Sequence, residues 1–595
     1  MILKKDLKET LLSIKPPFVF LETAVKDKSN KFSYLFFDFI DVIKFYPQDD
    51  VFKFFDKVQE FLEKGFWLVG YFNYEFGYYL EDSFLSFRKY TKEPLVWLGV
   101  SKKPIVLEDI KEPKITKNFK IKNIIPNIDF LQYKENIKKI KKYLEKGLTY
   151  QVNYTFKLKF KFIGDPVDLY LFLRKSQPTS YMAFINTLDN FIISLSPELF
   201  FRIEKNKIIS KPMKGTIQKG INYDQEISLI KKVLSDKKIK AENIMIVDLL
   251  RNDIGRISSK VWTEKLLEVE RYRTINQLTS TICGRLKKNL KFKDIFFSLF
   301  PCGSVTGAPK IETIKIIKSI EKEPRNIYTG AIGYINKKNA CFNVAIRTIR
   351  LYKNKGELGV GGGIVYDSLP KDEYKEAILK AKFLSEDFSD FFIFESILYK
   401  NGSFFLLDLH LKRLFKSARY FSIPINIDNI KKELNSKFYR KTDNLKVKVL
   451  VDINGKIKIE KSKLDNIEEP VDVKISIYKT DPKNIFLYHK TSKRDLYDLE
   501  LKKARKEGFF EVIFLNIYNE LTEGSITNIF IKKDGIFYTP PISCGLLAGV
   551  LREKLIKEKK AKERLIKLTD LKGSDLYIGN SVKGLIKVKK IYCPF

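Results

Sequence analysis

Glu373, Glu376 and Lys380 are spaced at i, i+3 and i+7 in the stretch PKDEYKEAILKAKF, which has a helical pattern. On a helix this spacing places the two carboxylates and the amine on one face. The preceding run Gly361–Gly363 lets backbone amides approach a ligand closely. Mg²⁺ prefers a few carboxylates and takes its other ligands from water or substrate oxygens. The pattern therefore predicts a Mg²⁺ site completed by an anionic substrate, while an ordinary solvated helix face explains the spacing alone equally well.

Lys214 lies directly before a Gly-Thr pair in the stretch SKPMKGTIQKG. Upstream, FFRIEKNKIIS alternates apolar and polar positions and predicts a hairpin with its turn around Lys205–Lys207. Lys214 is then expected on a short, constrained segment. In a chain this rich in lysine, the segment alone favours an ordinary surface lysine, because short patterns match by chance.

Three further segments of the first half place polar residues inside apolar patterns. AENIMIVDLLRNDIGRIS predicts a buried helix, with Ile244 among its apolar positions and Glu242 near its start. GSVTGAPK, followed by a helical pattern, predicts a helix N-terminus suited to an anion, or a structural turn. NIYTGAIGYINKKNACFNVAIRTIR predicts a hairpin with Tyr328 and Arg347, and an arginine on a buried strand needs an anionic partner.

The second half contains a set of residues suited to pyridoxal phosphate. Lys490 follows a strand-like run, Glu523 is expected in a turn before a strand, and Arg413 lies in an amphipathic helical stretch. LLAGVLREKLIKE predicts a helix that opens at Gly549, whose N-terminus can bind a phosphate. The cofactor requires a lysine for its aldehyde, a carboxylate for its pyridine nitrogen and groups that hold its phosphate. Each residue alone is more typical of a surface charge.

Composition limits the classes of protein to consider. The chain has 595 residues, 44% of them hydrophobic, which predicts two or more well-packed domains. The net charge of +38 comes from lysines spread evenly along the chain, so we expect no nucleic-acid binding. Five scattered cysteines and two histidines indicate a reducing compartment without zinc or histidine-triad chemistry. With no signal peptide or membrane span visible, a cytoplasmic protein is expected.

One domain boundary is expected near residues 385–390. There a helical pattern runs out into an acidic stretch, and a strand-like pattern begins at FFIFESILYKNGSFFLLD with Asn401-Gly402 as a hairpin turn. We expect one domain over residues 1–386 and a second over residues 390–595. The second should be able to stand alone as a domain.

The first half resembles the chorismate-utilising enzymes, which include anthranilate synthase, aminodeoxychorismate synthase and the isochorismate and salicylate synthases. The motifs YQVNYT, SLSPELFFR, KPMKGT, AENIMIVDLLRNDIGR, GSVTGAPK, AIRT and GGGIVYDS occur in the family's order. The resemblance covers about Phe18 to Leu384. It implies an α+β fold, an anthranilate synthase component I-like two-sheet α/β sandwich.

The same resemblance implies roles for individual residues. Glu242 and Glu376 would hold Mg²⁺, with Glu373 close by. Chorismate would be contacted by the residues at the positions of Gln151, Gly215, Thr216, Thr306, Tyr328, Arg347, Gly361, Gly362, Gly363 and Lys380.

Lys214 and Gln151 separate the branches of this family. Members that add water to the ring carry a basic lysine where this chain has Gln151, and a neutral amide cannot deprotonate water. Anthranilate synthases usually have a small residue at the position of Lys214, whereas aminodeoxychorismate synthases carry a lysine that is proposed to act as a nucleophile. AEN in place of AEH is also similar to that branch. The chain departs from the pattern at Gln277, where many relatives have an acid–base histidine.

The second half resembles the fold-type IV pyridoxal phosphate enzymes, which include branched-chain and D-amino-acid aminotransferases and aminodeoxychorismate lyase. HKTSKRDLYD is most similar to lyase forms fused to a synthase component, and GNSVKGLIKV adds Ser581 as an expected contact. Lys490 would be catalytic. The cofactor would also be held by Arg413, Glu523, Val550, Leu551 and Ser581.

Together the resemblances imply a bifunctional enzyme of 4-aminobenzoate synthesis for folate. Chorismate would be aminated with ammonia in a Mg²⁺-dependent reaction, and the product would lose pyruvate in a pyridoxal phosphate-dependent one. The alternative is an anthranilate synthase component I fused to a class IV aminotransferase. The chain shows no glutaminase cysteine motif, so a separate glutamine amidotransferase subunit or free ammonium is expected to supply ammonia. A homodimer through the second domain is possible.

Overall fold

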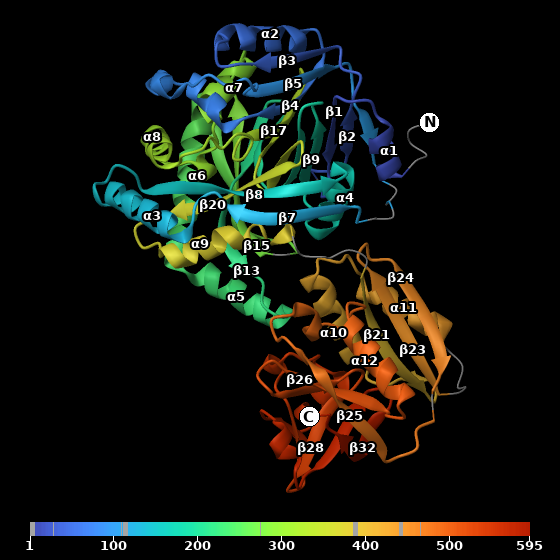
Figure 1. The fold of residues 1–595 in the computed structure, drawn as a ribbon. Helices are drawn as coiled ribbons and strands as arrows, with labels where there is room; N and C mark the ends of the chain where they lie inside the picture. Colours follow the sequence, from blue (N-terminus) through green and yellow to red (C-terminus); the bar gives the residue numbers. More distant parts are fainter. Residues whose placement is uncertain are drawn as a thin grey trace. The chain divides into compact units, whose positions relative to one another are not determined.

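The computed structural model describes residues 6–594 apart from residues 28, 109, 111–112, 114–116, 274, 385–390, 439–443 and 465. The chain forms two compact units (Figure 1). Unit 1 contains Met1–Ile217 and Lys232–Ser389, and unit 2 contains Gln218–Lys231 and Asp390–Phe595. The boundary expected at residues 385–390 lies outside the described residues.

Unit 1 is built on two ten-stranded sheets, as far as the described residues define them. The first sheet contains β1 (Phe18–Glu22), β2 (Ser33–Phe36), β6 (Ile105–Leu107), β7 (Phe119–Pro126), β8 (Gln151–Gly164), β9 (Tyr181–Asn186), β10 (Phe191–Ser196), β16 (Gly307–Ala308), β19 (Thr348–Tyr352) and β20 (Lys355–Ile364). The second contains β3 (Asp41–Phe45), β4 (Trp67–Phe72), β5 (Val96–Ser101), β11 (Leu199–Glu204), β12 (Lys207–Lys211), β13 (Met213–Gln218), β14 (Ser258–Arg271), β15 (Ile275–Leu286), β17 (Ala331–Ile335) and β18 (Asn339–Val344).

The two sheets of unit 1 contact each other through apolar side chains. One buried cluster combines Val19 and Ile185 of the first sheet with Val69, Trp97 and Ile332 of the second. Helices cover the other faces, where two larger clusters lie. These helices are α1 (Leu7–Ser13), α2 (Val51–Glu63), α3 (Phe130–Glu145), α4 (Pro166–Ser176), α6 (Lys237–Ile257), α7 (Phe292–Leu299), α8 (Lys310–Ile320) and α9 (Pro370–Leu379). The described pairings within both sheets are antiparallel, and the expected α+β class is confirmed.

Unit 2 has a small antiparallel sheet and a larger mixed sheet, drawn in orange to red in Figure 1. The small sheet contains β21 (Phe392–Lys400), β22 (Ser403–Phe404), β23 (Leu445–Asp452) and β24 (Ile457–Lys463). The mixed sheet contains β25 (Val471–Thr480), β26 (Glu511–Asn516), β27 (Leu521–Gly524), β28 (Asn528–Lys533), β29 (Ile536–Thr539), β30 (Ala561–Glu563), β31 (Asp575–Asn580) and β32 (Gly584–Tyr592). Its helices are α10 (Leu407–Tyr420), α11 (Ile427–Lys437), α12 (Asp495–Lys506), α13 (Val550–Lys557) and most of α5 (Tyr223–Ser235).

Several local predictions are confirmed and others are wrong. β11 and β12 form the expected hairpin, and Asn401 and Gly402 both have positive φ in the turn between β21 and β22. Ile244, predicted to be buried, is 46% exposed on α6. Arg347 was expected on a strand but lies between β18 and β19 with φ +50°, and Glu523, expected in a turn, lies in β27. The run before Lys490, predicted to be strand-like, is the 3₁₀ helix Ile485–Tyr488.

No helix in the described part of the chain has both the length and the apolar composition to cross a bilayer.

Candidate active sites

Gln151 and Lys214 meet over the glycine-rich strand β20. β20 pairs with β8 along its whole length, so that Gly363 lies opposite Asn153. A Cβ atom built on Gly363 would lie 1.9 Å from Gln151 Nε2 and 2.6 Å from Lys214 Nζ. The missing side chain at Gly363 therefore provides the space in which the Gln151 amide and the Lys214 amine are held.

The Lys214 amine has an environment that favours its neutral form. Burial lowers its pKa, the Glu242 carboxylate opposes this shift, and the cation of Lys380 adds to it. The direction is the one that a lysine nucleophile requires, because only the unprotonated amine carries a reactive lone pair.

Helix α9 presents its two carboxylates beside the same strand, as the spacing predicts. Lys380 Nζ lies 3.1 Å from the Glu376 carboxylate and donates to the Gly361 carbonyl oxygen at 2.8 Å. Ser368 Oγ donates to Glu373 Oε1 at 2.7 Å. Although burial opposes ionisation, Lys380 and then Thr216 hold the pKa of Glu376 below its usual value. The glycine run of strand β20, the carboxylate face of helix α9 and strand β13 thus belong to one site.

The carboxylates of this site fit a divalent cation. Burial raises the pKa of Glu373, and the negative charges of Glu376 and Glu242 raise it further. A bound cation would relieve this repulsion. Within the described residues no three acidic, histidine or cysteine side chains are close enough to hold a metal by themselves. Mg²⁺ needs only one or two carboxylates when substrate oxygens complete its shell, so the donor set fits Mg²⁺.

Arg347 is a buried cation without a full set of partners. It is 7% exposed, and its Nη1 atom has no hydrogen-bond partner among the described residues. Its guanidinium lies 5.4 Å from the centre of the Tyr272 ring, and burial lowers its pKa to about 10. A buried guanidinium with an unused hydrogen-bond donor fits a carboxylate ligand, which it can bind in a bidentate manner.

Tyr328, Thr306 and Gly215 also lie in unit 1, in different local settings. Tyr328 packs against β20, because a Cβ on Gly359 would lie 2.1 Å from Tyr328 Cγ. Thr306 uses its hydroxyl locally, donating to the carbonyl oxygens of Cys302 and Gly303. Gly215 has φ +96°, a backbone conformation that other residues rarely adopt. These positions shape the site's surroundings rather than offering a charged contact.

Glu198 is a candidate site residue that the sequence did not single out. It is 2% exposed, accepts a hydrogen bond from Ser304 Oγ at 2.6 Å and one from the Met213 amide at 3.4 Å. Burial raises its pKa to about 7, an effect that Ser304, Met213 and the Lys214 cation reduce. The only sequence signal is its place in SLSPELFFR, at the start of a buried strand.

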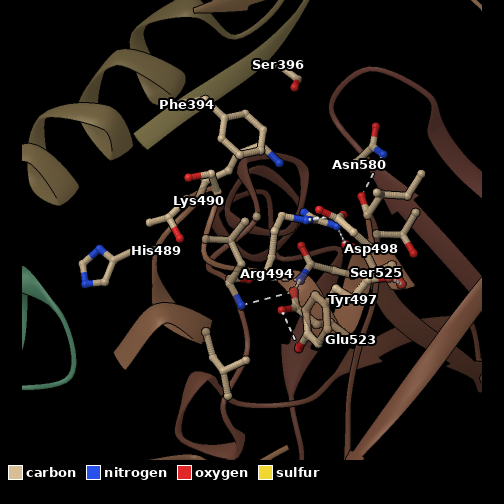
Figure 2. A pocket seen from close by; sticks show the side chains of 18 of the residues that line it. Phe394, Ser396, His489, Lys490, Arg494, Tyr497, Asp498, Glu523, Ser525 and Asn580 are labelled. Carbon is tan, nitrogen blue, oxygen red and sulfur yellow. Dashed lines mark hydrogen bonds and ion pairs between the residues drawn. The ribbon is translucent and has the colours of Figure 1, made fainter. Parts of the chain in front are cut away.

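Unit 2 contains a cavity of about 1060 Å³ that brings together most of the residues predicted for the cofactor (Figure 2). Arg413, Lys490, Glu523, Val550 and Ser581 line it. Leu551 instead belongs to an adjacent apolar cluster with Phe530, so only its backbone can serve a ligand at the start of α13. The structure thus supports a shared site for residues that are far apart in the sequence.

The environment of the Lys490 amine favours its reaction with an aldehyde. Lys490 Nζ lies 4.8 Å from the centre of the Phe394 ring, which Figure 2 shows beside it. Burial, followed by the cation of Arg413, lowers its pKa to about 7. Near neutral pH a large fraction of this amine is therefore unprotonated, which an ordinary lysine with a pKa of about 10.4 does not achieve.

Glu523 lies where it can pair with a pyridine nitrogen. Its carboxylate accepts hydrogen bonds from the Leu547 amide at 3.1 Å and from the Tyr497 hydroxyl at 3.3 Å (Figure 2). Burial raises its pKa to about 8, an effect that the Leu547 amide and the cations of Arg494 and Lys490 reverse only in part. A pyridinium nitrogen would supply a further cationic partner and stabilise the ionised form.

Arg413 is held by Glu395, a residue that the sequence reading missed. Arg413 Nε and Nη2 donate to the two oxygens of Glu395 at 2.8 and 2.6 Å, and Nη1 donates to the Ala548 carbonyl oxygen at 3.1 Å. His410 Nδ1 lies 2.6 Å from Glu395 Oε2. Burial opposes the ionisation of Glu395, yet Arg413 and His410 lower its pKa to about 2. Glu395 thus positions Arg413 at the turn before α13.

The turn before α13 requires a glycine at position 549. Gly549 is the N-cap of α13, and a Cβ there would lie 1.7 Å from Asn528 Oδ1. Asn528 is fixed in turn by a hydrogen bond from Nδ2 to the Leu547 carbonyl oxygen at 3.0 Å. The amides at the start of α13 and the nearby Arg413 and Ser581 fit the phosphate of pyridoxal phosphate.

Comparison with known proteins identifies the family of the chain. Residues 17–386 match the model of the chorismate binding enzymes, and residues 392–591 match that of the class IV amino-transferases. The protein therefore belongs to the chorismate-binding enzyme family, and its chorismate-binding domain is fused to a class IV aminotransferase domain.

Individual relatives cover only part of the chain. The aminodeoxychorismate synthase of Arabidopsis thaliana is 37% identical over 308 residues, which is 50% of this chain and 33% of that protein. Anthranilate synthase component 1 of Aquifex aeolicus is 35% identical over 274 residues, 45% of this chain and 55% of that protein. The chain thus spans about a third to about half of the length of these relatives. The crystal structure of anthranilate synthase component I from Streptococcus pneumoniae superposes with a TM-score of 0.52 at 26% identity, covering 61% of this chain and 94% of that chain, which confirms the two-sheet fold.

A methyl group at position 363 should disturb the first site without unfolding the domain. In Gly363→Ala the new Cβ would collide with the ends of two flexible side chains, Gln151 and Lys214, and would displace both. We expect chorismate consumption to fall about a hundredfold, as for other small misplacements of catalytic groups, while the melting temperature changes little.

Gly255→Ala is the control, because a Cβ on this glycine of helix α6 would have nothing within 4 Å and the residue lies outside the proposed site. Equal activity losses in the two variants, measured by the disappearance of chorismate, would contradict this description of the site.

The pH dependence of cofactor capture should report the lowered pKa of Lys490. The neutral amine is the reactive form, so its fraction rises as the pH increases through about 7 and then levels off. We expect the rate at which apoprotein develops the visible absorbance of bound pyridoxal phosphate to follow the same curve, with a plateau by about pH 8 to 9. A rate that climbs steadily towards pH 10, as for a solvent-exposed lysine, would disprove the assignment.

Proposed function

We propose that the protein makes 4-aminobenzoate from chorismate in two steps that its two domains catalyse. Unit 1 replaces the C4 hydroxyl of chorismate by an amine, and unit 2 eliminates pyruvate from the product. The observation that carries this proposal is that burial lowers the pKa of one lysine in each site, Lys214 beside the glycine strand and Lys490 in the large cavity.

In the amination step Lys214 acts as the nucleophile. Its neutral amine adds at C2 of chorismate, the double bond shifts, and the C4 hydroxyl leaves as water after protonation. Ammonia then adds at C4 and Lys214 is released, so that the net change is the exchange of ammonia for water. Glu198, whose pKa burial raises to about 7 and whose carboxyl interacts electrostatically with Lys214, is the proposed acid for the departing hydroxyl. It offers a proton donor in a chain that has Gln277 instead of a histidine.

Other residues of unit 1 orient the substrate. The guanidinium of Arg347 would bind a carboxylate, and the backbone of Gly361–Gly363 would allow close approach of the ring. Glu242 and Glu376, with Glu373 nearby, would hold Mg²⁺, which would neutralise negative charge on a substrate carboxylate. These interactions fix the ring with C2 towards Lys214.

In the elimination step Lys490 acts as the base. Pyridoxal phosphate, when bound, would supply an electron sink for the charge that develops at the amine-bearing carbon. Lys490 would take the proton from C4, after which the enolpyruvyl group leaves from C3 as pyruvate and the ring becomes aromatic. Glu523 would hold the pyridine nitrogen, while Arg413 and the start of α13 would hold the phosphate.

The competing proposal, an anthranilate synthase fused to an aminotransferase, is less well supported. Aminodeoxychorismate synthases and anthranilate synthases match the first half at similar identities, 34% for the Bacillus subtilis aminodeoxychorismate synthase component 1 and 35% for the Aquifex aeolicus protein. The choice therefore rests on Lys214, which lies directly against Gly363 and Gln151. A basic nucleophile at this point has no use in direct amination at C2.

The source of ammonia is proposed to be a separate subunit. The Bacillus subtilis and Aquifex aeolicus relatives are named as component 1 of their synthases. We propose that a glutamine amidotransferase supplies ammonia to this protein in the same way, and that free ammonium can replace it.

Two lysine variants should separate the two steps. With chorismate, Mg²⁺, ammonium and pyridoxal phosphate, Lys490→Ala should accumulate 4-amino-4-deoxychorismate, and Lys214→Ala should leave chorismate largely unconsumed. A mixture of the two variants should again make 4-aminobenzoate, because each supplies the step that the other lacks. Liquid chromatography with mass detection distinguishes these compounds.

Two results would contradict the proposal. One is 4-aminobenzoate formation by purified Lys490→Ala alone. The other is 2-aminobenzoate as the main product of the wild-type protein, which would favour the competing proposal.

A further inference from the structure

The segment Gln218–Lys231 belongs to unit 2 although it lies within the part of the sequence that matches the chorismate binding enzymes. It follows strand β13, which carries Lys214. Along helix α10 it is anchored by an ion pair of 2.5 Å between Asp224 and Lys416 and by a ring contact between Tyr223 and Phe415. Residues from the first half of the sequence are therefore a structural part of the unit that contains Lys490.

The first residues of this segment contact the end of α10 at Tyr420. Lys219 Nζ donates a hydrogen bond to the Tyr420 carbonyl oxygen and lies 4.6 Å from the centre of the Tyr420 ring. The Tyr420 hydroxyl donates in return to the Gly220 carbonyl oxygen at 2.7 Å. Tyr420 is 1% exposed, so these contacts form in a dry environment, where hydrogen bonds are electrostatically stronger than in water.

Tyr420 in turn supports His489, the residue directly before Lys490. The two rings lie 4.4 Å apart, and Ser417 Oγ is 3.0 Å from His489 Nδ1. Burial, followed by the nearby cation of Lys219, lowers the pKa of His489 to about 3. The imidazole is thus neutral near pH 7. Figure 2 shows it pointing away from the Lys490 side chain, towards the green ribbon of the segment.

The backbone of Lys490 is held from the opposite side by strand β21. The Phe394 amide donates to the Lys490 carbonyl oxygen at 2.9 Å, and the next residue, Thr491, forms a bridge with Ile393. The lysine therefore lies between β21 and the stack formed by His489, Tyr420 and Lys219. A group that must meet an aldehyde carbon has to be held within about 0.5 Å of its productive position, so both supports matter.

We propose that Lys219 and Gly220 are positioning residues of the pyridoxal phosphate site, which is incomplete without this segment of the first half. The inference rests on the proposed function, since it assumes that Lys490 bears the cofactor. Its consequence is that residues 390–595 contain every residue that would touch the cofactor and yet lack part of the support of Lys490. The position of Lys490 then depends on residues 218–231. A division of the chain at residue 386 would assign these residues to the chorismate-binding domain.

The test uses the full chain with Lys219→Met, which keeps the aliphatic stem but removes the charge and the hydrogen bond to Tyr420. Lys231→Met is the matched control, because Lys231 is an exposed lysine of the same segment. Tyr420→Phe, which loses only the hydroxyl bound to Gly220, is a second variant if Lys219→Met does not fold. The chain has two histidines, so nuclear magnetic resonance of histidine-labelled protein reports His489 and His410 separately.

We expect Lys219→Met and Tyr420→Phe to shift the imidazole signals of His489 and to leave those of His410 unchanged. We also expect the dissociation constant of pyridoxal phosphate to increase about threefold to tenfold, the effect of losing one hydrogen bond of support. The Lys231→Met control should match the wild type in both measurements.

Unchanged His489 signals and cofactor affinity in Lys219→Met and Tyr420→Phe would overturn this inference but would leave the proposed function standing. A wild-type protein that binds no pyridoxal phosphate would overturn the proposed function, and this inference with it. An equal loss of cofactor affinity in the Lys231→Met control would also overturn the inference, because it would show a nonspecific effect of the segment's charge.

Discussion

Both sites depend on withdrawing a lysine amine from water, which costs free energy and is tolerated only where the surrounding fold enforces it. Lys214 is pressed against a strand whose glycines leave space above the backbone, and Lys490 lies in a cavity against an aromatic ring. In each case burial is the largest cause of the lowered pKa, and a second cation, Lys380 or Arg413, adds to it. The packing around these amines thus favours their neutral form, which is the form that a nucleophile or a base requires.

The other charged groups of the two sites follow from the same constraint. Arg413 forms an ion pair with Glu395, and it can be held in the cavity wall because that carboxylate stays ionised. Among the described residues Arg347 has no equivalent partner for Nη1, and Glu523 keeps a raised pKa. Buried charged groups whose hydrogen-bonding capacity the described residues do not use, such as Nη1 of Arg347, indicate where charged ligands bind.

Features set by local spacing could be predicted from the sequence. Glu373, Glu376 and Lys380 share a face because helix geometry alone brings them together, and Asn401-Gly402 forms a turn because of its own backbone preferences. Glu198 and Glu395 were missed because their partners, Ser304 and Arg413, come from other elements.

The membership of Gln218–Lys231 in unit 2 could not be predicted either, because it depends on contacts with α10 and not on any local pattern. Ile244 and Arg347 were placed wrongly for a related reason. Periodicity identifies an apolar position or an apolar run, but tertiary contacts decide whether the position is covered and where the strand stops.

Peptide mapping of trapped covalent adducts tests the central claim most directly. The protein is quenched after exposure to chorismate and Mg²⁺ without ammonia, and a second sample is reduced with borohydride in the presence of pyridoxal phosphate. Our account predicts a chorismate-derived mass on the peptide of Lys214 in the first sample and a pyridoxyl mass on that of Lys490 in the second. Labels scattered over other lysines, or an unmodified Lys214 in a protein that still turns over chorismate, would contradict it.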